Sequence, residues 1–208
     1  KDIYNINTQK YNIEHSLARH GITTNEITDI ICTHLHFDHV GGNTKLESGK
    51  IVPTFPNANY WVTKENWELA NHPSQKDSGS FMEENWKVLA ENQMIKIVNG
   101  GEKFIEGVDI YLSYGHTEGL MHPILSDSRN TLFYGADIFP MAAHIPIPWV
   151  MAYDVQPVVT MKEKEKLLTK MHNENWILFF EHDPKIQACN IGWNGKQFHM
   201  KNEVFISE

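Results

Sequence analysis

Short apolar runs alternate with polar, glycine-containing breaks along most of the chain, and this pattern predicts short strands joined by turns. The β-branched run over residues 27–33 predicts a buried strand. Further strands are expected at 59–62, within 94–117, as a hairpin over 121–137, at 176–182 and as a pair at the C-terminus. No internal repeat or linker interrupts this alternation, so we expect one domain over residues 1–208.

Helical stretches lie between the predicted strands. They are expected over residues 12–21, 64–71, 80–92 and 160–173. Asn12 and Thr160 are good N-caps for the first and last of these helices, and Gly21 is a good stop for the first. Strands with helices between them indicate a mixed α/β fold, in which loops gather at one rim of a sheet.

The composition limits the kinds of partner. The 208 residues carry a formal net charge of -8, which argues against nucleic-acid partners because phosphate binding needs a basic surface. No apolar run approaches the roughly 20 residues that span a bilayer, so no membrane partner is expected. Cys32 and Cys189 are expected to be buried thiols in a reducing compartment. We therefore expect a cytoplasmic protein that acts on a small molecule.

The sequence THLHFDHVGG places three histidines and an aspartate within six positions. It follows a predicted strand, and its two glycines let the chain turn sharply. Residues i and i+2 of an extended segment point to the same side, so His34 and His36 can bind one metal ion. Asp38 and His39 come after the strand and can turn toward a second ion.

Three more potential metal ligands follow other predicted strands: His116, Asp137 and His182. Strand ends can converge at one rim of a sheet, and this convergence is the main evidence for a site. Five imidazoles with carboxylates suit two divalent ions, zinc first, with iron, manganese and cobalt as alternatives. They do not suit a structural thiolate site. The two oxygens of Asp137 can bridge both ions.

Four motifs, HLHFDHVGG, GHTEG, YGAD and FFEHD, occur in this order and together resemble the metallo-β-lactamase superfamily of dinuclear metallohydrolases. The resemblance implies a four-layer αββα sandwich. It also implies how the ligands divide between the two ions. The first metal would be held by His34, His36 and His116, the second by Asp38, His39 and His182, and Asp137 would bridge them.

The N-terminal part of the chain departs from this resemblance. Only 33 residues precede His34, whereas members of this fold usually carry several strands and an aspartate-containing turn before the histidine motif. No such turn is found among these residues. We therefore expect the numbered chain either to lack N-terminal strands of the first sheet or to pair the strands of that sheet differently.

The expected chemistry is metal-dependent hydrolysis. Two divalent ions about 3.5–4 Å apart can hold a bridging hydroxide at neutral pH. This hydroxide would attack an ester, a lactone or an organophosphate-like substrate. Asp38 is the expected proton shuttle and Asp137 the second catalytic residue, and no serine or cysteine nucleophile is needed.

Two alternatives stay open at this point. Glyoxalase II-like thioester hydrolases share the string THxHxDHxGGN, which residues 33–43 match, but they carry a second histidine where this chain has Leu120. A non-catalytic, metal-stabilised binding module is disfavoured, because structural zinc sites usually close with four ligands and favour cysteine.

The apolar, proline-rich segment 137–154 bears on the substrate. It can line a substrate pocket with Phe139, His144 and Trp149 as walls, or it can pack into the core or into a homodimer interface. The segment resembles the branch of N-acyl-homoserine lactonases and methyl-parathion-type hydrolases. The lactonases usually place a tyrosine where this chain has Pro140, which weakens lactone specificity and favours an organophosphate-like substrate.

Overall fold

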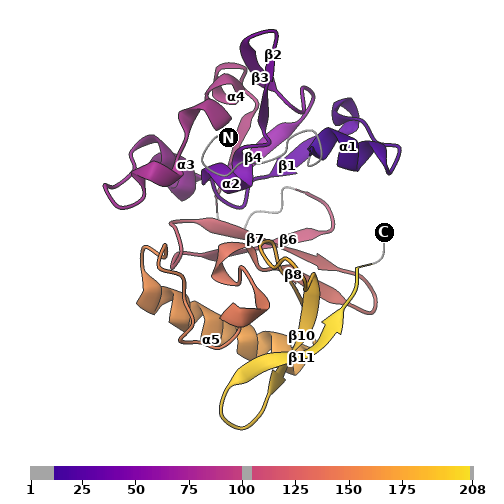
Figure 1. Cartoon of the computed structure of the whole chain (residues 1–208), viewed down its shortest axis with the longest axis vertical. Helices are drawn as coiled ribbons and strands as arrows, with labels where there is room; N and C mark the ends of the chain where they lie inside the picture. Colours follow the sequence, from indigo (N-terminus) through magenta and orange to yellow (C-terminus); the bar gives the residue numbers. More distant parts are fainter. Residues whose placement is uncertain (1–11, 100–104, 207–208) are drawn as a thin grey trace.

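Two β-sheets lie against each other in the computed structural model, which describes residues 12–99 and 105–206 (Figure 1). The first sheet has three parallel strands in the order β1 (Asp29–Ile31), β4 (Asn59–Thr63) and β5 (Ile95–Val98). The second has six strands in the order β11 (Phe198–Val204), β10 (Ala188–Trp193), β9 (Ile177–Phe179), β8 (Thr131–Tyr134), β7 (Leu120–Ser126) and β6 (Val108–Ser113). In the second sheet β8 and β9 run parallel, and the other neighbours run antiparallel.

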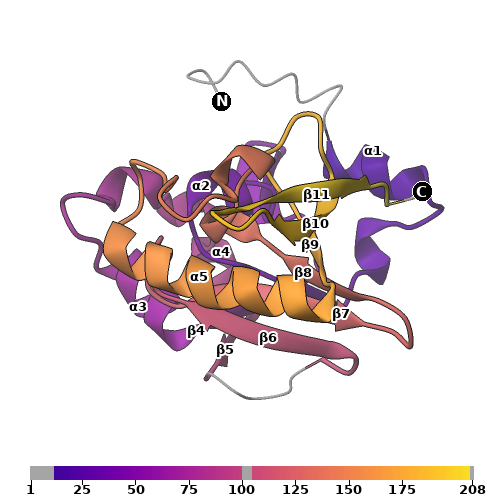
Figure 2. The ribbon, with the colours of Figure 1, turned by 90° about the horizontal axis from the view of Figure 1, so that it is seen from below.

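Helices cover the outer faces of both sheets. Helix α3 (Lys64–Asn71) packs on β4 and β5, and α4 (Lys87–Glu91) lies on the same half of the molecule (Figure 1). Helix α5 (Pro157–Glu174) packs against β10 and runs along the second sheet (Figure 2). This order of helix, sheet, sheet and helix confirms the predicted αββα fold.

The other described elements are short. They are α1 (Ile13–Ala18), α2 (Phe37–Val40), the hairpin of β2 (Thr44–Glu47) and β3 (Lys50–Pro53), and the 3-10 turns η1 (Thr24–Glu26), η2 (Ser78–Ser80), η3 (Glu83–Asn85), η4 (Ala136–Ile138) and η5 (Ala142–His144). Among residues 12–99 and 105–206, no helix has both the length and the apolar character needed to cross a membrane.

Each sheet buries an apolar core against its own helices. In the core of the second sheet, Leu168 and Met171 of α5 are fully buried together with Phe133 of β8. In the core of the first sheet, Tyr60 of β4 is fully buried together with Leu89 of α4. Removal of this apolar surface from water is the main force that holds the helices on the sheets.

Three of the four predicted helices form. Helix α1 begins after Asn12, whose side chain accepts a hydrogen bond from a backbone N–H at 2.8 Å, and α3 has the predicted bounds. Helix α5 starts at Pro157, so Thr160 lies inside it instead of capping it. The single helix predicted over 80–92 is wrong. The chain bends at Trp86, where φ is -140°, because this side chain is buried in the first core.

The strand predictions are close, with two differences. Strand β9 ends at Phe179, and His182 lies in the following loop, where its N–H donates to the Pro140 carbonyl at 3.0 Å. The apolar pattern also does not predict the hairpin of β2 and β3. Its turn depends on Ser48 and Gly49, whose φ angles are 50° and 78°.

Replacing Leu168 by Ala should lower the free energy of unfolding by about 2–5 kcal/mol, because the substitution removes a fully buried side chain between α5 and the second sheet. Chemical denaturation measures the change. Lys162→Ala, at an exposed position of the same helix, is the control and should change the free energy by less than about 0.5 kcal/mol. Equal effects of the two substitutions would contradict this packing of α5.

Candidate metal centre

The residues of the histidine motif lie directly after β1 of the first sheet. His34 and His36 flank Leu35, which is fully buried in the first core. Because side chains alternate along an extended segment, both histidines point away from that core. Asp38 and His39 follow on the one-turn helix α2. The local sequence therefore presents four side chains that can bind a metal at the end of one strand.

The remaining predicted ligands come from the second sheet. His116 follows β6, Asp137 lies in η4 after β8, and His182 lies in the loop after β9. Ala136 has a φ of 38°, a left-handed conformation that alanine rarely adopts. A Cβ atom at Gly135 would come within 2.8 Å of a backbone oxygen of β9. This tight turn directs the Asp137 carboxylate toward the histidines.

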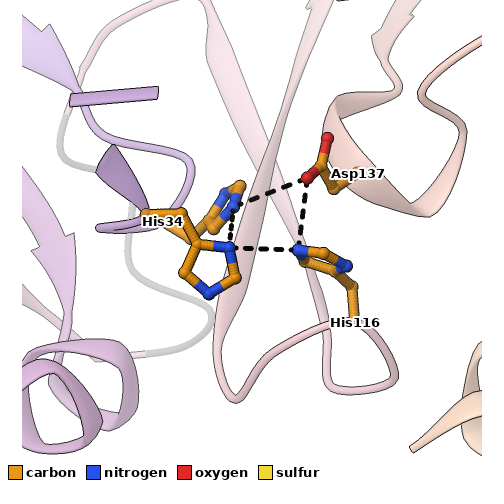
Figure 3. Close-up of side chains that lie close together, drawn as sticks. His34, His116 and Asp137 are labelled. Atoms are coloured by element: carbon orange, nitrogen blue, oxygen red, sulfur yellow. Dashed lines mark hydrogen bonds and ion pairs between the residues drawn. The ribbon is translucent and has the colours of Figure 1, made fainter. Parts of the chain in front are cut away.

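We call the following set the first group: His34, His36, His116 and Asp137. His36 Nδ1 lies 3.0 Å from His34 Nε2 and 3.3 Å from His116 Nε2. Asp137 Oδ2 lies 3.2 Å from His116 Nε2 and 3.8 Å from His34 Nε2. Figure 3 shows ring nitrogens of His34 and His116 and the Asp137 carboxylate turned toward one another.

The spacing within the first group fits a single metal ion. Bonds of about 2.0–2.1 Å in a tetrahedral site place neighbouring ligand atoms roughly 3.3–3.4 Å apart, and the distances here range from 3.0 to 3.8 Å. All four side chains are buried. Three ring nitrogens that face one another cannot all be satisfied by mutual hydrogen bonds, so a divalent cation satisfies this set of donors better.

We call a neighbouring set the second group: Asp38, His39 and His182. The Nε2 atoms of the two histidines lie 3.3 Å apart. Asp38 Oδ2 lies 3.6 Å from His39 Nε2 and 3.9 Å from His182 Nε2. Asp137 contacts this group as well, because its Oδ2 lies 3.2 Å from His39 and its Oδ1 lies 3.1 Å from His182. One carboxylate therefore touches both groups.

The surroundings of Asp137 favour its ionised form. Burial would raise its pKa, but hydrogen bonds from His182 and His39 and the charge of nearby histidines hold the pKa well below its usual range. Burial, reinforced by neighbouring histidines, lowers the pKa of His36 to about 3 and that of His34 well below 6.5. Both of these rings are neutral near pH 7 and can offer a lone pair to a metal.

His39 lies between two carboxylates. Burial lowers its pKa, but hydrogen bonds to Asp137 and Glu181 outweigh this effect and raise the pKa to about 10. A histidine that binds a metal must give up its proton at the ligating nitrogen. A metal ion and a proton therefore compete for this ring.

Three of the histidines turn their other ring nitrogen toward an oxygen atom of a neighbouring residue. The pairs are His116 Nδ1 with Asp154 Oδ1 at 2.9 Å, His39 Nδ1 with Glu181 Oε1 at 3.1 Å, and His34 Nδ1 with Thr33 Oγ1 at 3.2 Å. The outward Nε2 of buried His36 has no such partner among the described residues. Contacts of this kind fix the orientation of a metal-binding ring and make the ligating nitrogen more basic. They are arranged as in a metal site.

The centre opens to solvent on the side of the second group. The side chain of Asp38 is 43% exposed and that of His182 is 34% exposed, whereas that of Asp137 is 6% exposed. Water and a substrate can therefore reach the cluster past Asp38 and His182, while the first group lies deeper.

A family model described as the metallo-beta-lactamase superfamily matches residues 6–182. The chain belongs to the metallo-β-lactamase superfamily. An N-acyl homoserine lactonase of Bacillus sp. is 30% identical over 188 residues, which are 88% of this chain and 67% of that protein. An N-acyl homoserine lactonase of Bacillus thuringiensis is 25% identical over the same shares. The chain thus spans about two thirds of the length of these relatives.

Solved structures of the superfamily share the fold. AidC, a dizinc quorum-quenching lactonase in complex with a product, matches with a TM-score of 0.77 at 21% identity, over 93% of this chain and 70% of that one. A probable metal-dependent hydrolase from Staphylococcus aureus matches with a TM-score of 0.80 at 23% identity, over 93% of this chain and 69% of that one. The family and the histidine–aspartate cluster together identify this chain as a dinuclear metal-dependent hydrolase.

The predicted substrate walls of this superfamily hydrolase lie in three different environments. Phe139 is fully buried in the second core, so its ring offers no surface to a substrate, and the prediction for this residue is corrected. His144 is half-buried in η5, and Trp149 is 64% exposed. Lys164 Nζ fixes the loop that carries Trp149 by donating to the carbonyls of Pro146 at 2.9 Å and Trp149 at 2.8 Å. His144 and Trp149 stay predictions.

Three residues near the centre are missed by sequence reasoning. Buried Asp154 contacts His116, Glu181 contacts His39, and the ring of Phe81 lies 4.9 Å from the ring of His36. Asp154 and Phe81 are far in sequence from the histidines that they contact, and no periodicity marks them. Glu181 precedes His182 in the motif FFEHD, and this position is the only sequence signal among the three.

The two cysteines take no part in the centre. Cys32 and Cys189 are buried and free, as predicted. Burial raises the pKa of the Cys32 thiol to about 11 and that of Cys189 to about 12. Both are therefore thiols at neutral pH, and neither belongs to the first or second group.

Replacing Asp154 by Asn should weaken metal binding by roughly 10–100-fold, because the negative charge that orients the His116 ring is removed. Competition with a chromophoric chelator measures the dissociation constants. Asp29→Asn is the control, since Asp29 accepts a hydrogen bond from Trp61 Nε1 at 2.7 Å in the first sheet, outside both groups. Unchanged metal affinity in folded Asp154→Asn protein would show that this carboxylate does not support the centre.

Proposed function

We propose that this hydrolase cleaves an uncharged lactone or carboxylic ester with two divalent metal ions, zinc first among the candidates. His34, His36 and His116 would hold one ion, and Asp38, His39 and His182 the other. Asp137 would bridge the two ions. The observation that carries the proposal is the position of the Asp137 carboxylate, whose two oxygens lie within 3.2 Å of histidines from both groups.

The two ions would supply Lewis acidity, which activates water and polarises a carbonyl or phosphoryl oxygen. Histidine and carboxylate donors suit zinc, and they also accept iron, manganese or cobalt.

Asp38 is the carboxylate best placed to move a proton. Its side chain is 43% exposed at the open side of the centre, whereas that of Asp137 is 6% exposed and surrounded by histidines. The contacts of Asp38 with His39 and His182, at 3.6 and 3.9 Å, are long for hydrogen bonds. Its oxygens can therefore accept a proton from the attacking water and pass it to the leaving oxygen.

An uncharged substrate suits the electrostatics of the centre. In the described part of the chain, the carboxylates of Asp38, Asp137 and Asp154 form ion pairs with histidines and not with lysine or arginine. The charges of these carboxylates would offset those of two divalent ions, so an anionic glutathione thioester would gain little electrostatic attraction at the centre. The lactonase relatives support a lactone.

A second candidate substrate is an aryl phosphotriester. Pro140 occupies the position where lactonases usually carry a tyrosine, and its carbonyl accepts a hydrogen bond from the His182 N–H. This residue thus supports the backbone of a proposed metal ligand and brings no hydroxyl group to a lactone carbonyl. Half-buried His144, exposed Trp149 and Phe81 beside His36 are the proposed substrate walls.

The sequence-based expectations for location and assembly stay predictions. The chain is proposed to be cytoplasmic, to bind neither nucleic acid nor membrane, and to form a homodimer through its apolar surface. Trp149 and Tyr153, which are 64% and 76% exposed, are candidate contacts in such a dimer. Light scattering of the purified protein measures its assembly state.

Replacing Asp137 by Ala should lower kcat/KM by about 1000-fold or more, because loss of a bridging carboxylate removes several kcal/mol of transition-state stabilisation. The fold should persist, since Asp137 belongs to neither of the two apolar cores. Steady-state kinetics on a lactone measures the effect. Asp127→Ala, in the exposed turn between β7 and β8, is the control and should keep full activity. Unchanged turnover in Asp137→Ala would contradict the bridging role.

A substrate panel on zinc-loaded protein separates the candidates: an N-acyl homoserine lactone, an aryl ester, an aryl phosphotriester and a glutathione thioester. The highest kcat/KM is expected on the lactone or the aryl ester. A higher value on the phosphotriester would favour the second candidate. A preference for the thioester would contradict the proposed substrate class, and metal binding without turnover of any substrate would support a binding module.

A further inference from the structure

The first group is built from two separate parts of the chain. His34 and His36 follow β1 of the first sheet, and His116 follows β6 of the second sheet. The ring nitrogens of His36 and His116 nevertheless lie 3.3 Å apart. A metal ion in such a site needs this spacing to be fixed before it binds, because any adjustment of two loops would cost binding free energy.

The side chain of Asn66 connects these two parts. Its Oδ1 accepts a hydrogen bond at 2.8 Å from the backbone N–H of Leu35, the residue between the two histidines of the motif. Its Nδ2 donates at 2.8 Å to the carbonyl of Glu118 and at 3.4 Å to Thr117 Oγ1, directly after His116. Asn66 is fully buried. One side chain therefore holds both loops of the first group.

Asn66 is itself held at the start of α3. Its backbone N–H donates to Thr63 Oγ1 at 3.2 Å, and the same hydroxyl donates to the Gly119 carbonyl at 2.7 Å. Gly119 has a φ of 68°, and a Cβ atom there would come within 2.6 Å of Thr63 Oγ1. The start of α3 and the loop after His116 are thus closely packed. This packing fixes the position of Asn66 relative to the histidine motif.

An amide side chain suits this position for a chemical reason. Asn66 must accept one hydrogen bond and donate two, and asparagine carries one carbonyl oxygen and one NH2 group in a rigid plane. A carboxylate would lose the donors, and an aliphatic side chain would lose all three bonds. Because the Leu35 N–H and the Thr117 hydroxyl are buried, these groups would be left without a replacement partner.

We propose that Asn66 is a positioning residue for metal binding, which sets the distance between the His36 and His116 ligands by joining their loops. This inference rests on the proposed ligand groups. Asn66 touches neither ligand side chain through its own hydrogen bonds, so it acts through the backbone of Leu35 and Glu118.

Replacing Asn66 by Ala should weaken one of the two zinc-binding steps by roughly 10–100-fold and leave the other step unchanged, by analogy with supporting residues around metal ligands. Zinc titration against a chromophoric chelator resolves the two dissociation constants. Cobalt titration gives a second readout, because the d–d absorption of the first group should appear only at higher cobalt concentration.

Two variants, each of which lacks one proposed ligand, show which zinc-binding step Asn66→Ala weakens. In His182→Ala, where the second group lacks a ligand, the added Asn66→Ala should weaken the remaining step by the same factor. In His116→Ala, where the first group lacks a ligand, Asn66→Ala should have no effect on the remaining step. The reverse pattern would overturn the proposal, because it would place the effect on the second group.

A matched control separates positioning from a general loss of stability. Asn190 is also a buried asparagine: its side chain donates to the Trp176 carbonyl at 3.1 Å and accepts from Asn202 at 3.0 Å. It pairs with Ile177, at the end of β9 that lies away from His182. Asn190→Ala should lower the free energy of unfolding but leave both zinc dissociation constants unchanged. Equal metal affinities in the two alanine variants would overturn the positioning role.

Thr63→Val tests the same connection if Asn66→Ala does not fold. Valine has the shape of threonine but removes the hydrogen bond to the Gly119 carbonyl, so the same zinc step should weaken by a smaller factor. Unchanged zinc affinity in Thr63→Val would then count against the proposal. If the unsubstituted chain binds no zinc, the proposed function fails. If it binds two ions and the Asn66 and Thr63 variants bind them equally well, only this inference fails.

Discussion

The buried carboxylate of Asp137 is the interaction on which the rest of the site depends. Its oxygens lie within 3.2 Å of His39, His116 and His182. A buried charge is costly unless it is fully paired, so the fold must bring these rings to it from both sheets. The turn at Ala136, with its left-handed φ, accepts local strain to aim this side chain.

Polar residues around the centre keep the histidine rings in position. Asp154, Glu181 and Thr33 each contact the nitrogen of a histidine ring that faces away from the centre, and Asn66 holds the loops that carry the rings. These polar groups are spread over both sheets and over the start of α3. Formation of the centre therefore requires the two halves to be packed correctly, and metal binding should stabilise that packing in return.

The clustering of the candidate ligands could be predicted from sequence because their signals are local. Alternation along an extended segment brings His34 and His36 to one side, and the other ligands follow apolar runs that form strands. The supporting residues could not be predicted in this way. Asn66 meets Leu35 across 31 positions and Asp154 meets His116 across 38, and such contacts exist only once the sheets have packed. A buried asparagine or aspartate has no periodic signature.

The environment of the side chains in the segment 137–154 could not be predicted from sequence either. Its apolar composition allows a pocket wall or a core, and the pattern alone cannot choose between them. Phe139 turns inward because η4 and the core of the second sheet leave it no exposed position, whereas Trp149 remains on the surface. The break at Trp86 has a similar cause, since burial of one large ring overrides a helical pattern.

The most direct test of a dinuclear centre bridged by Asp137 is a crystal structure of the zinc-loaded protein with anomalous diffraction measured at the zinc absorption edge. Such a centre should give two anomalous peaks, one on either side of Asp137. One should be bonded to His34, His36 and His116, and the other to Asp38, His39 and His182. A single peak closed by four protein ligands, or two peaks that do not share Asp137, would contradict it.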